Sequence, residues 1–273
     1  MKICIIGGTG FIGSNLIPKL ISEGHHVIVT GRSKIKAEKH AWFKQVSFFE
    51  LDIRQEISNN ILKEISNVDK LIYLAWDGLP NYNSLNHIDN NLFNNYFIIK
   101  KLIQNGLKDI LILGTCFEYG KRDGSLNVNL ITNPVNSYAI AKDSLRKFIF
   151  LLKNDYEFNI KWVRLFYLYG EGQDENSLIP LLLKAVEKKQ EFFNMSSGEQ
   201  IRDYLSIEEV CQKLIYFSFL NNESGIYNCC SGIPISVRRF VEEYINTNNF
   251  DIKLNLNYYP QSQFESFSFW GEV

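Results

Sequence analysis

Short apolar runs alternate with amphipathic stretches along the first two thirds of the chain. The first run, "KICIIGG", ends in glycine, and the stretch "FIGSNLIPKLISEG" after it has apolar residues at helical spacing and closes on Gly24. Further apolar runs are "HVIVTGR", "VSFFEL", "DKLIYLA", "DILILG" and "IKWVRLF". Helical patterns such as "NNLFNNYFIIKKLIQNG" and "SYAIAKDSLRKFIFLLKNDY" separate the later runs. Apolar strands separated by helices predict a parallel sheet covered on both faces, which is a doubly wound α/β fold.

The alternation loosens after about residue 170. There the chain runs through "SLIPLLLKAVEKKQ" and "FFNMSSGEQIRDYLSIEEV" into a final region with several asparagines and aromatic residues. We therefore predict a doubly wound domain over residues 1–168 and a smaller mixed lobe over residues 169–273.

Composition narrows the class of protein. A chain of 273 residues with 45% hydrophobic and 22% charged residues is typical of one globular α/β domain with a small appended lobe. The net charge of −1 provides no general attraction to nucleic acid or to an anionic membrane. No apolar run approaches the roughly 20 residues of a spanning helix, and "MKICIIGG" leads directly into a strand. We expect a cytosolic protein without nucleic-acid or membrane partners.

The cysteines form no CxxC pair and no clustered histidines accompany them, so we expect no metal site. Neighbouring cysteines cannot easily meet disulfide geometry, and buried reduced thiols are favoured over redox chemistry. The five are Cys4, Cys116, Cys211, Cys229 and Cys230.

A glycine triplet lies where the first strand leads into the first helix. Gly7, Gly10 and Gly13 permit positive φ, close backbone approach and tight helix packing, and the helix amides at Phe11 and Ile12 are available to an anion. The segment predicts binding of a dinucleotide pyrophosphate by the first domain. A purely structural turn is the alternative.

The end of the second strand bears on the choice of cofactor. An acid at this place binds the adenosine ribose and repels a 2′-phosphate, whereas this chain has Arg32 and Ser33, which could bind that phosphate. NADP(H) is therefore favoured over NAD(H), with a solvated surface arginine as the alternative. Asp52, with Ile53 beside it, follows the third strand and is a candidate for the adenine amino group, or a helix cap.

Tyr138 and Lys142 are four residues apart in "NSYAIAK". On a helix this spacing places them on the same face, one turn apart. On a solvated face the pair would have no role. In a cleft the ammonium would lower the pKa of the phenol from its usual value near 10 and make it a usable acid.

The glycine turn, "SYAIAK", "RLFYLYG" and "RDYLSIEEV" occur in an order that resembles the extended short-chain dehydrogenase/reductase family, whose fold is Rossmann-like. The stretches "GTCFEYG" and "LAWDGLPNY" are similar to bacterial nucleotide-sugar 4-keto-6-deoxyhexose reductases. The resemblance implies that Tyr138 is the catalytic acid/base and that Lys142 is its partner and binds the nicotinamide ribose. It also implies that the Thr115 hydroxyl orients the sugar oxygen. An ordinary helix and a strand-end threonine are the alternatives.

The resemblance assigns further binding residues. Leu74 and Ala75 match backbone contacts along the cofactor, and Arg202 matches an arginine that binds the nucleotide diphosphate. A structural ion pair with Asp203 is the alternative for Arg202. Tyr82 is a candidate sugar contact, with simple packing as the alternative.

Three positions depart from the family pattern. Cys116 and Phe117 replace the acid pair of the dehydratases, which disfavours dehydration, and the role of Glu118 stays open. Tyr167 occupies the place of a substrate-binding asparagine. The chain also ends soon after "FESFSFWGEV", where relatives usually continue, so either the substrate lobe is abbreviated or the chain is truncated.

The residues and the resemblance together predict an NADPH-dependent 4-ketoreductase of a nucleotide-diphosphate 4-keto-6-deoxy sugar, in the synthesis of cell-surface polysaccharide. One alternative is a 4-epimerase with tightly bound NAD, and Arg32 argues mildly against it. Another is a non-catalytic dinucleotide-binding protein. The resemblance also allows a homodimer through the helices that hold Tyr138 and "NNLFNNYFIIKKL".

Overall fold

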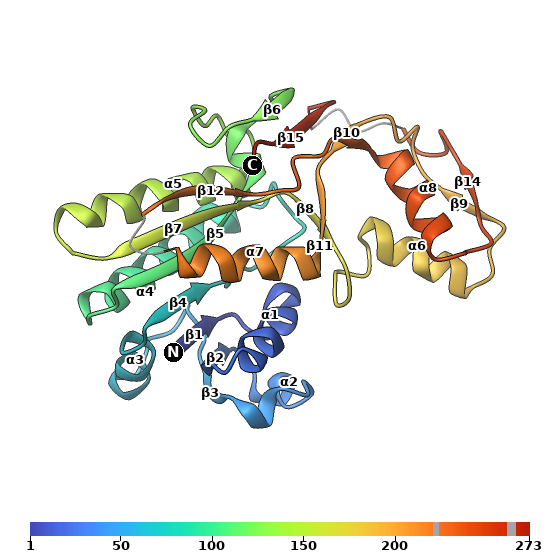
Figure 1. Cartoon of the computed structure of the whole chain (residues 1–273). Helices are drawn as coiled ribbons and strands as arrows, with labels where there is room; N and C mark the ends of the chain where they lie inside the picture. The colour runs from blue at the N-terminus through green and yellow to red at the C-terminus, as the bar shows by residue number, and fades with distance from the viewer. Residues whose placement is uncertain (221–223, 261–265) are drawn as a thin grey trace.

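Seven parallel strands form the central sheet of the protein (Figure 1), whose computed structural model describes residues 1–220, 224–260 and 266–273. The strand order is β12-β7-β5-β4-β1-β2-β3. All six apolar runs noted in the sequence form strands of this sheet, which confirms the predicted Rossmann-like α/β fold. The strands are β1 (Lys2–Ile6), β2 (His26–Gly31), β3 (Ser47–Glu50), β4 (Lys70–Tyr73), β5 (Asp109–Thr115), β7 (Asn159–Leu165) and β12 (Gly225–Cys229).

Helices cover both faces of the sheet, and alternate residues of each strand face different cores. Ile3 and Ile5 of β1 pack with one set of helices, whereas Cys4 and Ile6 pack with the other. The first set is α1 (Phe11–Ser22), α2 (Lys34–Ala37) and α7 (Ile207–Phe219). The second set is α3 (Asn59–Ser66), α4 (Phe93–Gln104) and α5 (Ser137–Leu151).

Local sequence determines where several helices begin. Before each of α3, α5, α7 and α8 (Val237–Thr247), a polar side chain accepts a hydrogen bond from the amide three residues later. Such a cap contributes about 1 kcal/mol to helix stability. The capping residues are Ser58, Asn136, Ser206 and Ser236.

The C-terminal lobe is built around α6 (Leu178–Glu187) and α8, which share a small apolar core (Figure 1). Short strand pairs accompany them and join the lobe to the sheet. They are β9 (Phe192–Asn194) with β14 (Lys253–Asn255), β10 (Ile201–Arg202) with β13 (Ile235–Ser236), β11 (Tyr204–Ser206) with β8 (Tyr167–Tyr169), and β15 (Phe269–Gly271) with β6 (Gly124–Leu126). Between these short strands the chain returns to the large sheet, where α7 covers one face and β12 forms the edge strand. The domain division at residue 168 stays a prediction.

One-turn elements connect the larger ones. They are the 3₁₀ turns η1 (Phe43–Gln45), η3 (Cys116–Tyr119) and η4 (Leu152–Asn154), and the π-helical turn η2 (His87–Leu92) before α4. None of the helices in the described ranges is long and apolar enough to cross a membrane.

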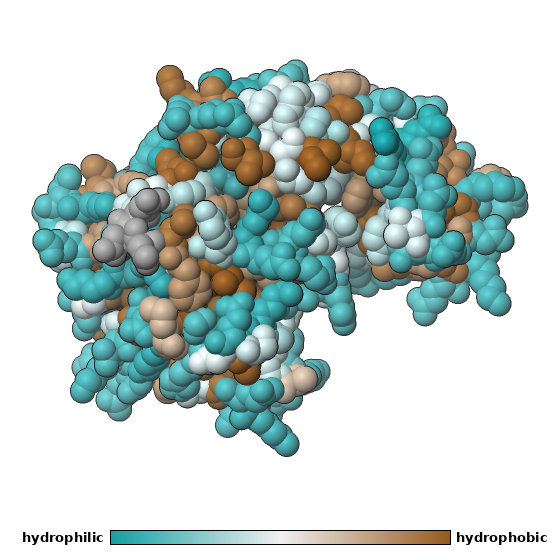
Figure 2. Space-filling view, in the orientation of Figure 1, coloured by the Kyte–Doolittle hydropathy of each residue, from teal (hydrophilic) through white to brown (hydrophobic). Residues whose placement is uncertain are grey.

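The carboxyl ends of β1 and β4 meet where the chain changes direction across the sheet, because β2 and β3 lie on one side of β1 and β5 lies beyond β4. Ligands of doubly wound folds bind at this switch point. The space-filling view shows a hollow between the part of the molecule that holds α1 and the C-terminal lobe (Figure 2).

Candidate active site

Three cavities follow one another along the carboxyl edge of the sheet. The Arg32 cavity, of about 360 Å³, is bounded by residues that include Gly10, Arg32, Asp52, Ala75 and Trp76. The central cavity, of about 430 Å³, is bounded by residues that include Gly7, Phe11, Thr115, Tyr138 and Tyr167. The Lys121 cavity, of about 540 Å³, is bounded by residues that include Tyr82, Cys116, Phe117, Lys121 and Phe269. Neighbouring cavities share lining residues, so together they form one cleft.

The predicted cofactor residues lie along the first two cavities. Gly7, Gly10, Phe11, Ile12, Gly13 and Tyr138 line the central cavity, whereas Arg32, Ser33, Asp52, Ile53, Leu74 and Ala75 line the Arg32 cavity. Lys142 is 5% exposed, and its Nζ lies 4.0 Å from the ring centroid of Trp76, which lines both cavities. Residues from β1, β2, β4 and α5 are thus brought to one cleft.

The glycine turn has the backbone that an anion site needs. Gly7 has φ of +84°, and a Cβ there would lie 2.8 Å from the amide nitrogen of Ala75. A Cβ on Gly13 would lie 2.5 Å from the carbonyl oxygen of Gly8, so glycine lets α1 approach the turn. Helix α1 starts at Phe11 with neither a side-chain cap nor an acid in its first turn. Its first amides therefore remain available to a pyrophosphate.

Charged side chains surround the Arg32 cavity in two pairs. Arg32 Nη1 lies 2.8 Å from Asp77 Oδ2, and Arg54 Nε donates to Asp52 Oδ1 at 2.9 Å. The hydrogen bond from Arg54 lowers the pKa of Asp52. Asp52 is not the cap of α3, since Ser58 has that role, so the cap alternative for Asp52 is wrong.

Ser33 caps α2 by accepting from the amide of Lys36, and Lys36 also lines the Arg32 cavity. Three basic residues and two carboxylates thus surround this cavity. The carboxylates belong to Asp52 and Asp77.

Tyr138, Lys142 and Thr115 lie together, as the spacing and the resemblance anticipated. Asn136 caps α5 by accepting from the amide of Ala139 at 2.8 Å, which places Tyr138 in the first turn of the helix. The side chains of Tyr138 and of Thr115, the last residue of β5, line the same central cavity. Tyr138 is 7% exposed, so this face of α5 faces the cleft and not the solvent.

The electrostatics of the pair depend mainly on burial. Burial raises the pKa of Tyr138 well above its usual value. In the protein by itself the net shift is therefore upward, and the lowering expected from the ammonium together with an oxidised nicotinamide stays a prediction. Burial also lowers the pKa of Lys142 to about 7. The consequence is a neutral phenol at neutral pH, which is the form that donates a proton.

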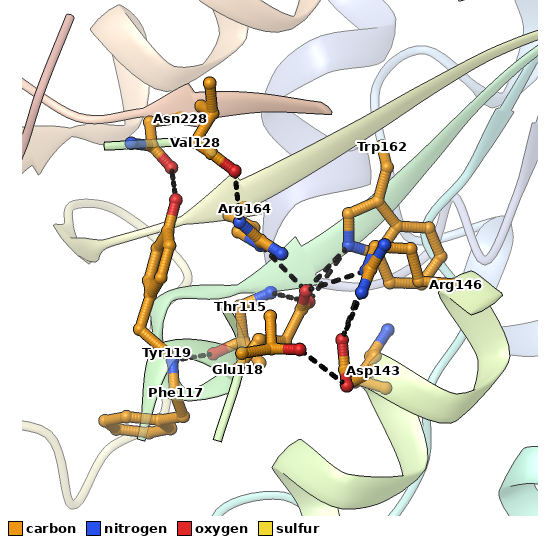
Figure 3. Close-up of polar contacts among 12 residues, drawn as sticks. Thr115, Phe117, Glu118, Tyr119, Val128, Asp143, Arg146, Trp162, Arg164 and Asn228 are labelled. Atoms are coloured by element: carbon orange, nitrogen blue, oxygen red, sulfur yellow. Dashed lines mark hydrogen bonds and ion pairs between the residues drawn. The ribbon is translucent and has the colours of Figure 1, made fainter. Parts of the chain in front are cut away.

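Glu118 lies behind Thr115 and is fully buried (Figure 3). Its carboxylate accepts hydrogen bonds from the amide of Thr115 at 2.9 Å, from Trp162 Nε1 at 3.0 Å and from Arg164 Nε at 2.8 Å. Because the carboxylate is paired with these groups, it does not replace the acid pair that Cys116 and Phe117 lack. Its role is to hold the end of β5.

The candidate substrate residues have different environments. Tyr82 lies between the rings of Tyr138 and Phe117, with centroids 5.6 and 5.3 Å away, and its carbonyl accepts from the amide of Tyr138. Arg202 is 4% exposed, and its guanidinium lies 4.6 Å from the ring centroid of Phe269. Their roles toward a ligand stay predictions.

The alternative for Arg202 was an ion pair with Asp203. The carboxylate of Asp203 forms its hydrogen bonds with other groups. Asp203 accepts hydrogen bonds from the amides of Ser231, Gly232 and Gly271, and from the Ser231 hydroxyl. These bonds join the loop after β12 to β15. The five cysteines are buried and none of them forms a disulfide, in agreement with a structural role.

Sequence reasoning missed several residues of the cleft. Trp76 has no role in the sequence analysis, yet Lys142 Nζ lies 4.0 Å from the centroid of its ring, and His87 accepts from its Nε1 at 3.2 Å. Asp77 and Arg54 were also missed. An aromatic residue directly after a strand end was the available signal for Trp76. No local sequence signal indicated His87, because its hydrogen bond with Trp76 depends on the path of the loop between β4 and η2.

A doubly wound sheet with a glycine turn after β1 and a buried Tyr138–Lys142 pair beside Thr115 is the arrangement of an extended short-chain dehydrogenase/reductase. Residues 3–230 match the NAD dependent epimerase/dehydratase family, and the chain belongs to this family. The resemblance seen in the sequence is thereby confirmed.

Two curated relatives are similar over most of their length. The chain is 33% identical to a dTDP-6-deoxy-L-talose 4-dehydrogenase (NAD(+)) of Aggregatibacter actinomycetemcomitans over 99% of both chains. It is 25% identical to a dTDP-4-dehydro-6-deoxyglucose reductase of Escherichia coli, over 88% of this chain and 79% of the relative.

Solved structures share the fold. A UDP-glucose 4-epimerase superposes with a TM-score of 0.84 at 22% identity, over 100% of this chain and 89% of the epimerase. A UDP-glucuronic acid 4-epimerase from Bacillus cereus, in complex with UDP-glucuronic acid and NAD, gives 0.81 at 19% identity, over 100% and 90%.

Replacing Gly7 with alanine tests the glycine turn. Gly7→Ala places a Cβ against the backbone of Ala75, and we expect dinucleotide binding to weaken roughly tenfold or more, as strain of about 1–3 kcal/mol implies. Gly24→Ala is the matched control, since Gly24 has φ of +81° with nothing within 4 Å of a Cβ. Calorimetric titration with NAD and NADP measures both variants. Equal binding by the two would contradict the assignment.

Proposed function

We propose that the protein is a cytosolic, NADPH-dependent reductase of the 4-keto group of a nucleotide-linked 4-keto-6-deoxy sugar, serving the synthesis of cell-surface polysaccharide. The observation that carries the proposal is that the buried Tyr138 and Thr115 line one cavity with the glycine turn, while Lys142 is buried one helix turn from Tyr138. The names of the two curated relatives both describe position 4 of a dTDP-linked 6-deoxy sugar. Cell fractionation tests the location.

The residues divide the chemistry between them. When bound, the reduced nicotinamide supplies a hydride. Thr115 holds the sugar oxygen, and Tyr138 donates its proton to that oxygen as the carbonyl becomes an alcohol. The neutral phenol that burial favours is the protonation state this step needs. Lys142 lies one turn away and stabilises the phenolate that remains.

The apolar character of the site supports a deoxygenated sugar. Phe117 and Tyr167 line the central cavity beside Thr115, together with Leu79 and Tyr82. Aromatic and aliphatic side chains favour a methyl group over a hydroxymethyl group, because a buried hydroxyl needs a hydrogen-bond partner.

The larger outer space supports a nucleotide as the remote part of the substrate. The Lys121 cavity joins the central cavity through Tyr82, Cys116 and Phe117. Arg202 lies directly behind Phe269, which lines the Lys121 cavity. We propose that this region binds the nucleotide diphosphate and thereby aligns the sugar with Tyr138.

Replacing Tyr138 with phenylalanine tests the proposed acid. We expect Tyr138→Phe to lower the rate of NADPH oxidation roughly 10²- to 10⁴-fold, since general acid catalysis contributes that much. A panel of nucleotide-linked 4-keto-6-deoxy sugars provides the substrates, and absorbance at 340 nm measures turnover. Tyr73→Phe is the control, because the Tyr73 hydroxyl is buried in β4 without a hydrogen-bond partner in the described part of the chain.

Two other functions would appear in the same experiment. No oxidation of NADPH or NADH with any sugar, together with NAD that survives dialysis, would replace the proposal with a 4-epimerase. The similarity in fold to UDP-sugar 4-epimerases is the reason to test this alternative. A non-catalytic role would be indicated by a cellular function that Tyr138→Phe leaves intact.

We propose that Arg32 and Lys36 favour NADP(H) over NAD(H), because both line the cavity where an adenosine 2′-phosphate would lie. The curated relative with 33% identity has NAD(+) in its name, so the preference needs a direct test. We expect Arg32→Ala to raise KM for NADPH about tenfold and to change KM for NADH less than about twofold. Arg239→Ala, at an exposed pair on α8, is the control. A parallel rise for both cofactors would contradict the assignment.

We also propose a homodimer through α4 and α5. Phe93, Phe97, Phe148 and Leu151 on these helices are 37–62% exposed, and a contiguous apolar face of this kind marks an interaction surface. Light scattering after size exclusion should give twice the mass of one chain, and Phe97→Glu should give a monomer. A monomeric wild type at a concentration of tens of micromolar would exclude the dimer.

A further inference from the structure

The side chain of Trp76 is fixed from behind by a buried histidine. Trp76 Nε1 donates to His87 Nδ1 at 3.2 Å, and His87 Nε2 lies 2.8 Å from the carbonyl oxygen of Asn81. The carbonyl can only accept, so Nε2 carries the proton and Nδ1 presents its lone pair to the indole. His87 is fully buried, and Asn91, which also contacts Nδ1, donates to the carbonyl of Asp77. The orientation of the indole is therefore determined.

The face of this indole lies against the ammonium of Lys142. The distance from Lys142 Nζ to the ring centroid is 4.0 Å, within the range of a cation–π interaction. Lys142 Nζ also donates to the carbonyl of Leu113 at 2.9 Å. An aromatic face and a carbonyl dipole thus support the buried charge. The edge of the same indole contacts Tyr138, with ring centroids 5.8 Å apart.

We propose that Trp76 is a positioning residue of the active site. His87 holds its indole, and the aromatic face of the indole favours the charged form of Lys142 beside Tyr138. This inference rests on the proposed function for its catalytic consequence, because the charge of Lys142 stabilises the phenolate of Tyr138. Within the described ranges, the other titratable groups around Lys142 are Tyr138 on its own helix, Glu118 on η3 and His87 behind the indole.

The direction of the effect follows from the charges. Burial alone disfavours the ammonium, and the aromatic face opposes this effect. Loss of that face should lower the pKa of Lys142 by roughly 0.5 to 1.5 units. Entry of water into a space left by the indole would act oppositely and raise the pKa. The sign of the shift therefore separates the two effects.

The experiment is an NMR titration of protein labelled with ¹³C at the lysine ε-carbons, in which Lys142→Arg identifies the Lys142 signal. We expect Trp76→Leu to lower the midpoint by roughly 0.5 to 1.5 pH units and Trp76→Phe, which keeps an aromatic face, to lower it less. His87→Leu should shift it in the same direction as Trp76→Leu, whereas His87→Gln, which can both donate and accept, should shift it least.

A second tryptophan–histidine pair provides the control. Trp42 is buried and stacks on His40 with ring centroids 4.8 Å apart, in the core on the α1 side of the sheet. Trp42→Phe should leave the Lys142 midpoint unchanged. An unchanged or raised midpoint in Trp76→Leu would overturn the inference. The titration needs no substrate, so a failure of the sugar panel would reject the proposed reaction and leave the assignment of Trp76 intact.

Discussion

One buried carboxylate connects the elements on which the cleft depends. Glu118 binds the amide of Thr115 in β5 and the side chains of Trp162 and Arg164 in β7, and Arg146 of α5 lies 3.8 Å away. A buried carboxylate is stable only when its oxygens accept hydrogen bonds. The need to satisfy Glu118 therefore fixes the positions of these partners relative to one another. The strand end that holds Thr115 and the helix that holds Tyr138 and Lys142 are therefore positioned by the same group (Figure 3).

The network continues from this carboxylate to the edge of the sheet. Arg164 lies 4.4 Å from the ring centroid of Tyr119, whose hydroxyl donates to Asn228 of β12 at 2.7 Å. Asn228 in turn donates to the carbonyl of Leu126 in β6, which pairs with β15 near the C-terminus. Residues more than 100 positions apart thus support one side of the cleft.

The two ends of the cleft have different physical character. Around the Arg32 cavity, exposed charged side chains pair with one another and remain partly in water, so each pair contributes little to stability and can exchange partners for a ligand. Around Tyr138, the phenol, the ammonium and the neighbouring aromatic rings are buried. Low polarity there makes the protonation states sensitive to every nearby dipole, which is why Trp76 and the Leu113 carbonyl matter to Lys142.

Much of the fold could be predicted because its signals are local. Six strands, the glycine turn and the helix that holds Tyr138 and Lys142 follow from apolar periodicity and glycine placement. The spacing of Tyr138 and Lys142 was sufficient to place them on one helix face. The return of β12 to the large sheet was not predicted, since its pairing with β7 joins segments about sixty residues apart.

The sequence by itself determined the class of fold, the glycine turn before α1 and the placement of Tyr138 and Lys142 on one helix face, because each depends on residues a few positions apart. Only the tertiary structure decided that Glu118 faces the core, that Asp77 pairs with Arg32, and that His87 holds Trp76 against Lys142. It also decided the direction of the Tyr138 pKa, since burial raises it. The physical reason is that desolvation and contacts between distant segments exist only once the chain has packed.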